Sequence, residues 1–210
     1  MPRLVVLVIV FSAFSVAYSQ RTLSENIWTS LVFRYKTPRF QVTGDMGYRM
    51  CDNYIHSKRT ILARLTIEKS FKNNSLGLGY AYFEHYINSQ STENRLFVEY
   101  SRQFDLERRN FNLRLRNELR TFNDRRTTNR IRIQGTFCRE LTKQIEARLS
   151  SEIFYTPGKQ ALIEQRYSTG LIWKFHQLFT IIPFYTLQWQ SNVPYPQHIF
   201  GTQFQVSLEH

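Results

Sequence analysis

NFNLRLRNELRTFNDRRTTNRIRIQGTFCRELTKQIEARLSSEIFY, residues 110–155, is the stretch that decides the fold predicted for this chain. Taken two residues at a time, its start has an apolar side and a polar side: Phe111, Leu113, Leu115 and Leu119 oppose Asn112, Arg114, Arg116, Glu118 and Arg120. The same alternation occurs in 130–140 and again in 145–155. Because side chains of an extended chain point alternately to its two faces, the stretch predicts three successive strands, each with an apolar and a charged face.

The charged faces of these strands carry both signs of charge. In a soluble β-sandwich such a face would meet water, whereas in a membrane barrel it would line the enclosed lumen and the apolar face would meet lipid. Similar strands are predicted along the whole chain, at about 26–35, 40–49, 61–68, 76–82, 93–104, 110–120, 130–140, 145–155, 164–175, 178–190 and 198–208. Most run for roughly ten residues or more, which is enough to cross a bilayer at a tilt and longer than ordinary globular strands. Strand length therefore favours the membrane.

An even strand number is the rule for single-chain bacterial barrels, so residues 20–26 are expected to add a short twelfth strand. The prediction is an all-β, antiparallel, transmembrane up-and-down β-barrel of ten to twelve strands, with twelve as the best estimate. One local alternative stays open, because Leu141, Ile145, Leu149 and Ile153 also follow a helical four-residue spacing. The neighbouring strands favour a strand there.

Residues 1–19 have the features of a secretory signal peptide. Arg3 precedes an apolar run from Leu4 to Val16, and small residues at Ala17 and Ser19 occupy the positions that a signal peptidase reads. The run is too short for a transmembrane helix. Residues 20–210 are therefore predicted to form a single exported barrel domain in the outer membrane.

The charge balance is strongly basic, with 28 Lys and Arg against 16 Asp and Glu and a formal net charge of +12. Such a balance raises nucleic acid as a partner. The basic residues are instead spread through the strands, and an exported protein seldom meets nucleic acid, so no nucleic-acid partner is expected. Outer-membrane lipids and the phosphates of lipopolysaccharide are the counter-charges expected for Lys and Arg at strand ends.

Cysteine and histidine usage points to no metal, cofactor or catalytic site. Cys51 and Cys138 are compatible with one disulfide and equally with two thiols, and no His lies at ligand spacing from either. An acyl hydrolase would need a Ser and a His with a third group orienting the imidazole, and no His-x-Ser-Asn motif is present. Since His85 and His198 lie near strand ends, a lipid-modifying enzyme that pairs one of them across the barrel stays as a second alternative.

The charged faces of the predicted strands converge on a lumen network. Its expected members are Arg64, Glu68, Glu99, Arg114, Arg116, Glu118, Arg120, Arg130, Arg132, Glu140, Glu146, Arg148, Glu152, Glu164 and Arg166. Buried charges of this kind must pair. The favoured interpretation is a salt-bridged network that fills or narrows the barrel, and the alternative is a small anion-attracting pore or ligand-transport barrel, because Arg outnumbers acid on the central strands.

Short segments also carry a family resemblance: Trp28-Thr29, Gly47-Tyr48-Arg49, the run 114–120, Arg130-Ile131-Arg132-Ile133, Ser151-Glu152-Ile153-Phe154-Tyr155 and Gln165-Arg166-Tyr167. In their order and spacing they resemble the uncharacterised family of small bacterial outer-membrane barrels known as domain of unknown function 2490. The resemblance implies the fold, the outer membrane and insertion by the barrel assembly machinery, and it implies no activity. The chain departs from such barrels at its end, where Leu208-Glu209-His210 replaces the usual terminal aromatic residue.

Overall fold

Eleven strands form one closed barrel in the computed structural model of this chain. The structure describes residues 25–209 apart from 54–55, 88, 159–161 and 192. The expected signal peptide and most of the expected twelfth strand lie outside these residues. The strands are β1 Glu25–Lys36, β2 Phe40–Asn53, β3 His56–Phe71, β4 Asn74–Ile87, β5 Ser89–Leu106, β6 Arg109–Phe122, β7 Thr128–Glu140, β8 Ile145–Thr156, β9 Leu162–Lys174, β10 Phe179–Gln190 and β11 Gln197–Glu209.

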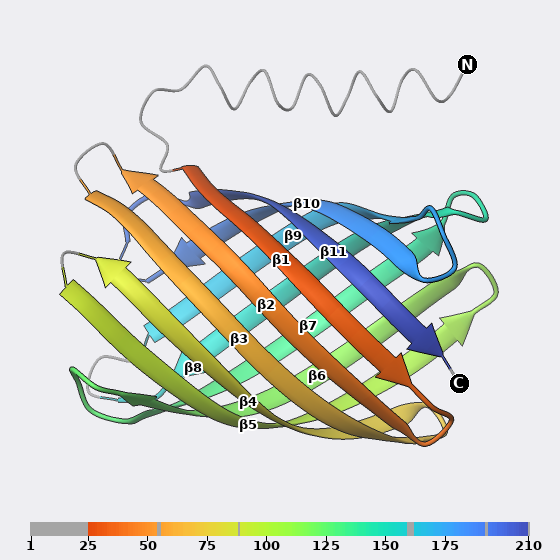
Figure 1. Cartoon of the computed structure of the whole chain (residues 1–210), viewed down its shortest axis with the longest axis horizontal. Helices are drawn as coiled ribbons and strands as arrows, with labels where there is room; N and C mark the ends of the chain where they lie inside the picture. Colours follow the sequence, from red (N-terminus) through yellow and green to blue (C-terminus); the bar gives the residue numbers. More distant parts are fainter. Residues whose placement is uncertain (1–24, 54–55, 88, 159–161, 192, 210) are drawn as a thin grey trace.

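Each strand pairs with the next in antiparallel order, and the barrel closes where β1 pairs with β11 in parallel. The closing register runs from Glu25 opposite His198 to Lys36 opposite Glu209, so it spans the whole of β1. Figure 1 shows the two strands side by side, with the start of β1 and the end of β11 at opposite ends of the barrel. An odd number of strands requires one parallel pair. The expected antiparallel barrel of ten to twelve strands is confirmed. The best estimate of twelve strands is wrong, because the described residues form eleven strands and the parallel pair of β1 and β11 leaves no open sheet edge.

The length of the strands and the apolar side chains on their outer face agree with a membrane-spanning barrel. The strands contain between 12 residues in β1 and 18 in β5, and several extend beyond their expected ends; β2 and β3 grow into the expected connection 51–58. The outward positions carry large apolar side chains that are 48–61% exposed, among them Leu65, Leu78, Leu96, Leu115, Ile133 and Leu149. Lipid is the environment in which such a surface is stable. The described residues include no helix long and apolar enough to span a membrane.

Two open questions from the sequence are settled by the register. Residues 145–156 form β8, a strand paired with β7 and β9, so the helical spacing of Ile145, Leu149 and Ile153 does not produce a helix. Cys51 lies opposite Asn26 near the start of β1, and Cys138 lies near the end of β7. These positions are at opposite ends of the barrel, whereas disulfide-linked Cα atoms lie within about 7 Å of each other.

The barrel interior contains aromatic and aliphatic side chains as well as charged ones. Leu62, Ala81, Phe83 and Phe97 form a buried apolar cluster inside β3, β4 and β5. Phe97 lies across Gly79 on the neighbouring strand, and a Cβ on Gly79 would stand 2.1 Å from the end of the Phe97 ring. Gly79 is therefore required by close packing in the lumen.

We expect Gly79→Val to destabilise the folded barrel by about 1–3 kcal/mol, because the added methyl groups must displace Phe97. Gly44→Val is the matched control, since no atom lies within 4 Å of the Cβ that it would add. Thermal unfolding in detergent, followed by circular dichroism, measures both. Equal unfolding temperatures for the two variants would contradict the packing of Phe97 on Gly79.

Candidate functional site

The charged network lies on the inner face of β5 to β8, and strand register brings its members together. Glu99 on β5 is opposite Arg116 on β6, and Glu118 on β6 is opposite Arg130 on β7. Directly opposite residues on one face of an antiparallel pair have neighbouring side chains. Alternation along the chain thus supplies the charges, and register decides which of them meet.

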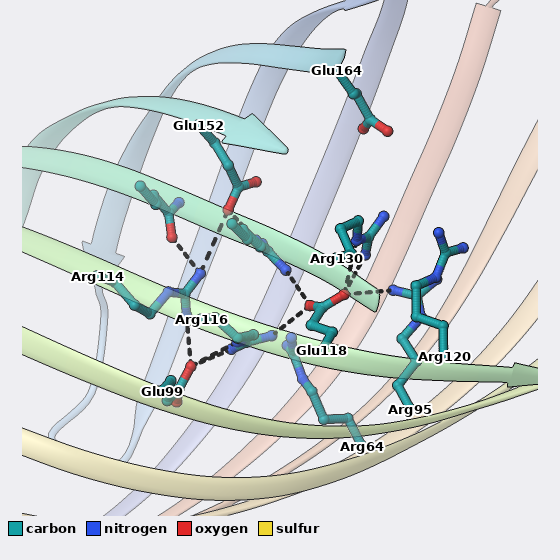
Figure 2. A network of polar contacts seen from close by, with 12 residues as sticks. Arg64, Arg95, Glu99, Arg114, Arg116, Glu118, Arg120, Arg130, Glu152 and Glu164 are labelled. Atoms are coloured by element: carbon teal, nitrogen blue, oxygen red, sulfur yellow. Dashed lines mark hydrogen bonds and ion pairs between the residues drawn. The ribbon is translucent and has the colours of Figure 1, made fainter. Parts of the chain in front are cut away.

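Glu118 is the centre of the network. Its carboxylate lies 2.5 Å from Nη2 of Arg130, 3.6 Å from Nη1 of Arg116, 3.5 Å from Nη1 of Arg132 and 4.0 Å from Nη1 of Arg95. Figure 2 shows Glu118 between Arg116, which lies on the same strand, and Arg130, which lies on the neighbouring strand β7. Only 1% of Glu118 is exposed, so four guanidinium groups take the place of water around this carboxylate.

Arg116 extends the network toward β5, and Arg132 extends it toward β8. Arg116 donates to Glu99 through Nε at 2.8 Å and Nη2 at 2.5 Å, while Arg132 donates to Glu152. Arg114 lies 3.8 Å from each of Glu99 and Glu152. The ion pairs therefore form a continuous path across four strands, β5 to β8.

A second centre, Glu93 on β5, was missed at the sequence level. Its carboxylate accepts two hydrogen bonds from Arg95, at 2.6 and 3.0 Å, and another from Arg120. Glu93 is in phase with Glu99 on the same strand, which is the signal that would have identified it. Asp45, which accepts from Arg64, was missed in the same way on β2.

Several arginines of the network place their guanidinium groups over aromatic rings. Arg116 lies 4.1 Å from the centroid of Phe97, and Arg95 lies 3.7 Å from that of Phe83. Phe154, which is 2% exposed, has three guanidinium groups around it, those of Arg130, Arg132 and Arg166 at 4.9, 4.9 and 4.5 Å. In each contact, cation–π attraction compensates part of the hydration that the guanidinium group loses when it is buried.

Seven of the expected members lie apart from the two centres: Arg64, which binds Asp45, and Glu68, Glu140, Glu146, Arg148, Glu164 and Arg166. Glu146 pairs with Lys174 in place of an arginine, and Glu164 pairs with Arg166 at 2.5 Å. Glu68 flanks Gly77 together with Glu99 and accepts a hydrogen bond from Ser75 at 3.4 Å. Within the described part of the chain, Glu140 and Arg148 make no ion pair; Glu140 lies exposed at the end of β7.

A cavity of about 230 Å³ lies beside the network inside the barrel. Of the described residues that line it, eight are arginines and three are acids: Arg49, Arg64, Arg95, Arg116, Arg130, Arg132, Arg148 and Arg166 against Asp45, Glu118 and Glu152. The lining thus has five more positive than negative charges. Polar uncharged side chains from β9 to β11, including Ser168, Thr186 and Gln203, complete the wall.

His85 lies between a hydroxyl and an acid. Its Nδ1 is 3.0 Å from Oγ1 of Thr60, and its Nε2 is 3.3 Å from Oε2 of Glu93. The order of groups matches a hydroxyl–imidazole–carboxylate triad. His198 has a different environment, because its Nδ1 lies 2.6 Å from the Tyr185 hydroxyl. Among the described residues no three His, Cys, Asp or Glu side chains are grouped as a metal site.

Comparisons with known proteins agree with this architecture. The structure is similar to the translocator domain of the autotransporter NalP from Neisseria meningitidis, with a TM-score of 0.52 and 10% identity, over 77% of this chain and 71% of that one. It is also similar to a loop-deletion mutant of OmpT, an outer membrane protein of Vibrio cholerae, with a TM-score of 0.49 and 10% identity. That match covers 79% of this chain but spans only 58% of the OmpT mutant. At these identities the likeness shows the fold alone.

The sequence comparisons give a family and no characterised relative. The family model for "Protein of unknown function (DUF2490)" matches residues 25–198, which cover all of β1 to β10. None of the curated proteins matches the chain.

Proposed function

Because this chain belongs to the DUF2490 family of proteins of unknown function and has the fold of an outer-membrane β-barrel, we propose that it is an outer-membrane barrel whose lumen is closed by its own charged side chains. In this role the apolar outer surface contacts the lipids and lipopolysaccharide of the outer membrane, after export by the signal peptide and insertion by the barrel assembly machinery. The interior blocks the free passage of ions.

The observation that supports closure is the buried ion-pair path from Glu99 through Arg116, Glu118 and Arg132 to Glu152. Arg116 is 3% exposed and Glu118 is 1% exposed. Charges that line a wide aqueous channel would keep their water, whereas these groups contact each other and the rings beneath them. The lumen at this level is therefore occupied by side chains.

We expect the purified protein to show little conductance in planar lipid bilayers, because the path from Glu99 to Glu152 occupies the lumen where ions would pass. Current recordings in a salt gradient measure both conductance and selectivity. The alternative function, an anion-attracting pore, is favoured by the arginine excess of the cavity. Steady anion-selective current from the unmodified protein would establish that alternative.

The contact of Thr60, His85 and Glu93 is the one observation that favours a lipid-modifying enzyme. We propose no catalysis there. Glu93 already accepts hydrogen bonds from Arg95 and Arg120, so its negative charge is compensated before it can stabilise an imidazolium. The arrangement is explained by the need of the buried Glu93 carboxylate for hydrogen-bond donors on all sides.

A further inference from the structure

Arg49 is a guanidinium group in the lumen that the charged network does not use. It lies on β2 opposite Trp28 of β1, and its Cζ is 4.2 Å from the centroid of the Trp28 ring and 5.7 Å from that of Phe83. Within the described residues Arg49 makes no ion pair, although it lines the cavity. A cation held on an aromatic ring with no acid beside it has unused donors that face the cavity.

The charges around Arg49 are mostly of its own sign. Arg64, Arg95 and Arg166 line the same cavity as Arg49, and Asp45 is the acid on the same strand that lines it. Asp45 is already bound by Arg64. In a space of low dielectric such repulsion between cations is costly unless an anion lies between them.

Arg166 approaches the same indole from β9. Its Cζ is 5.1 Å from the Trp28 centroid, so two guanidinium groups lie against one ring. Arg166 is held in place by Glu164, at 2.5 Å, and by Gln188, whose amide oxygen accepts from its Nε at 2.9 Å. Arg166 is thus positioned by its neighbours.

Uncharged hydroxyl groups from β9 and β10 line one side of the cavity. The Ser168 and Thr186 hydroxyls lie 2.6 Å apart and both line the cavity. The volume of about 230 Å³ is below the usual range of about 300–1,000 Å³ for pockets that hold drug-sized ligands. The cavity therefore suits a small ligand, and the excess of arginine suits one with more than one negative charge.

We propose that the lumen cavity is a binding site for a small oxyanion with at least two negative charges, held by Arg49 and Arg166 beside Trp28. Planar guanidinium groups recognise phosphate and carboxylate oxygens through paired hydrogen bonds, so both chemistries are compatible with the site. Such a ligand would relieve the repulsion at Arg49 and leave the pairs of Glu118 intact. This inference does not depend on whether the lumen conducts.

The test is a titration of the folded full-length barrel in detergent with pyrophosphate and, separately, with succinate, at constant ionic strength. Isothermal calorimetry measures affinity. Quenching of tryptophan fluorescence that is lost in a Trp28→Phe variant reports on Trp28, one of three tryptophans in the chain. We expect saturable binding of at least one probe, and the preferred probe identifies a phosphate or a dicarboxylate ligand. Arg49→Gln and Arg166→Gln should each weaken binding by about tenfold or more, since each removes a charge-assisted hydrogen bond.

Arg125→Gln is the matched control, because it removes the same charge from a side chain that is 60% exposed and outside the cavity. It should bind the probe as the unmodified protein does. The proposal is overturned if neither probe binds saturably or if Arg49→Gln binds the preferred probe as tightly as the unmodified protein does.

Discussion

Replacing Arg116 with alanine is expected to lower the free energy of unfolding of the barrel in detergent by about 3–5 kcal/mol. Arg116 donates two hydrogen bonds to Glu99, lies beside Glu118 and covers the Phe97 ring at 4.1 Å. The variant leaves Glu99, which is 4% exposed, without its closest cation in a space that water scarcely reaches. Denaturant titration followed by circular dichroism, with heat-dependent gel mobility as a second readout, measures the loss.

Arg125→Ala is the control for the Arg116 variant. Arg125 is 60% exposed, and its Nε is 4.0 Å from Asp124 in the connection after β6, so its removal should change stability by less than about 1 kcal/mol. If Arg116→Ala is as stable as this control and the unmodified protein carries anion-selective current, the lumen is wet and the closed barrel is wrong.

Glu118→Gln is expected to have an effect of similar size, about 3–5 kcal/mol, although it preserves the shape of the side chain. Four arginines lie within 4.0 Å of this one carboxylate. The amide removes the negative charge and leaves these cations to repel one another. The same unfolding measurement, made at low and at high salt, tests whether repulsion among the arginines causes the loss. If anions from the salt can enter the lumen, they should screen this repulsion and restore part of the lost free energy of unfolding.

A double-mutant cycle separates the pair energy from general damage to the lumen. Arg130, which pairs with Glu118 at 2.5 Å, is replaced by Met alone and together with Glu118→Gln. Residues in direct contact usually couple by about 0.5–3 kcal/mol, so the double variant should be more stable than the sum of the two single losses implies. Additive losses would show that the two side chains act independently.

Several features of the fold followed from local pattern. The two-residue period between Asn110 and Tyr155 predicted β6, β7 and β8 and the side of each strand that faces the lumen. This success has a simple cause, because the direction of a side chain on a strand depends only on its position in the strand. The charges of Arg116 and Glu118 on the inner face followed in the same way.

Which charged side chains contact each other depends on strand register. Register is the alignment of two neighbouring strands, so it cannot be derived from either strand alone. Glu93 pairs with His85, Arg95 and Arg120, which lie on three different strands. The spacing of residues along the chain does not indicate that these side chains meet. Glu146 was expected to meet an arginine and meets Lys174, because β8 pairs with β9 at that level.

The sequence by itself determined the β class and the division between an apolar outside and a charged inside. These properties depend on residues next to one another in the chain. Only the tertiary structure decided that eleven strands close through the parallel pair of β1 and β11 and that Glu118 lies among four arginines. It alone placed Arg49 and Arg166 against the same indole. The physical reason is that these contacts join residues far apart in sequence, whose proximity is set by strand register and by closure of the barrel.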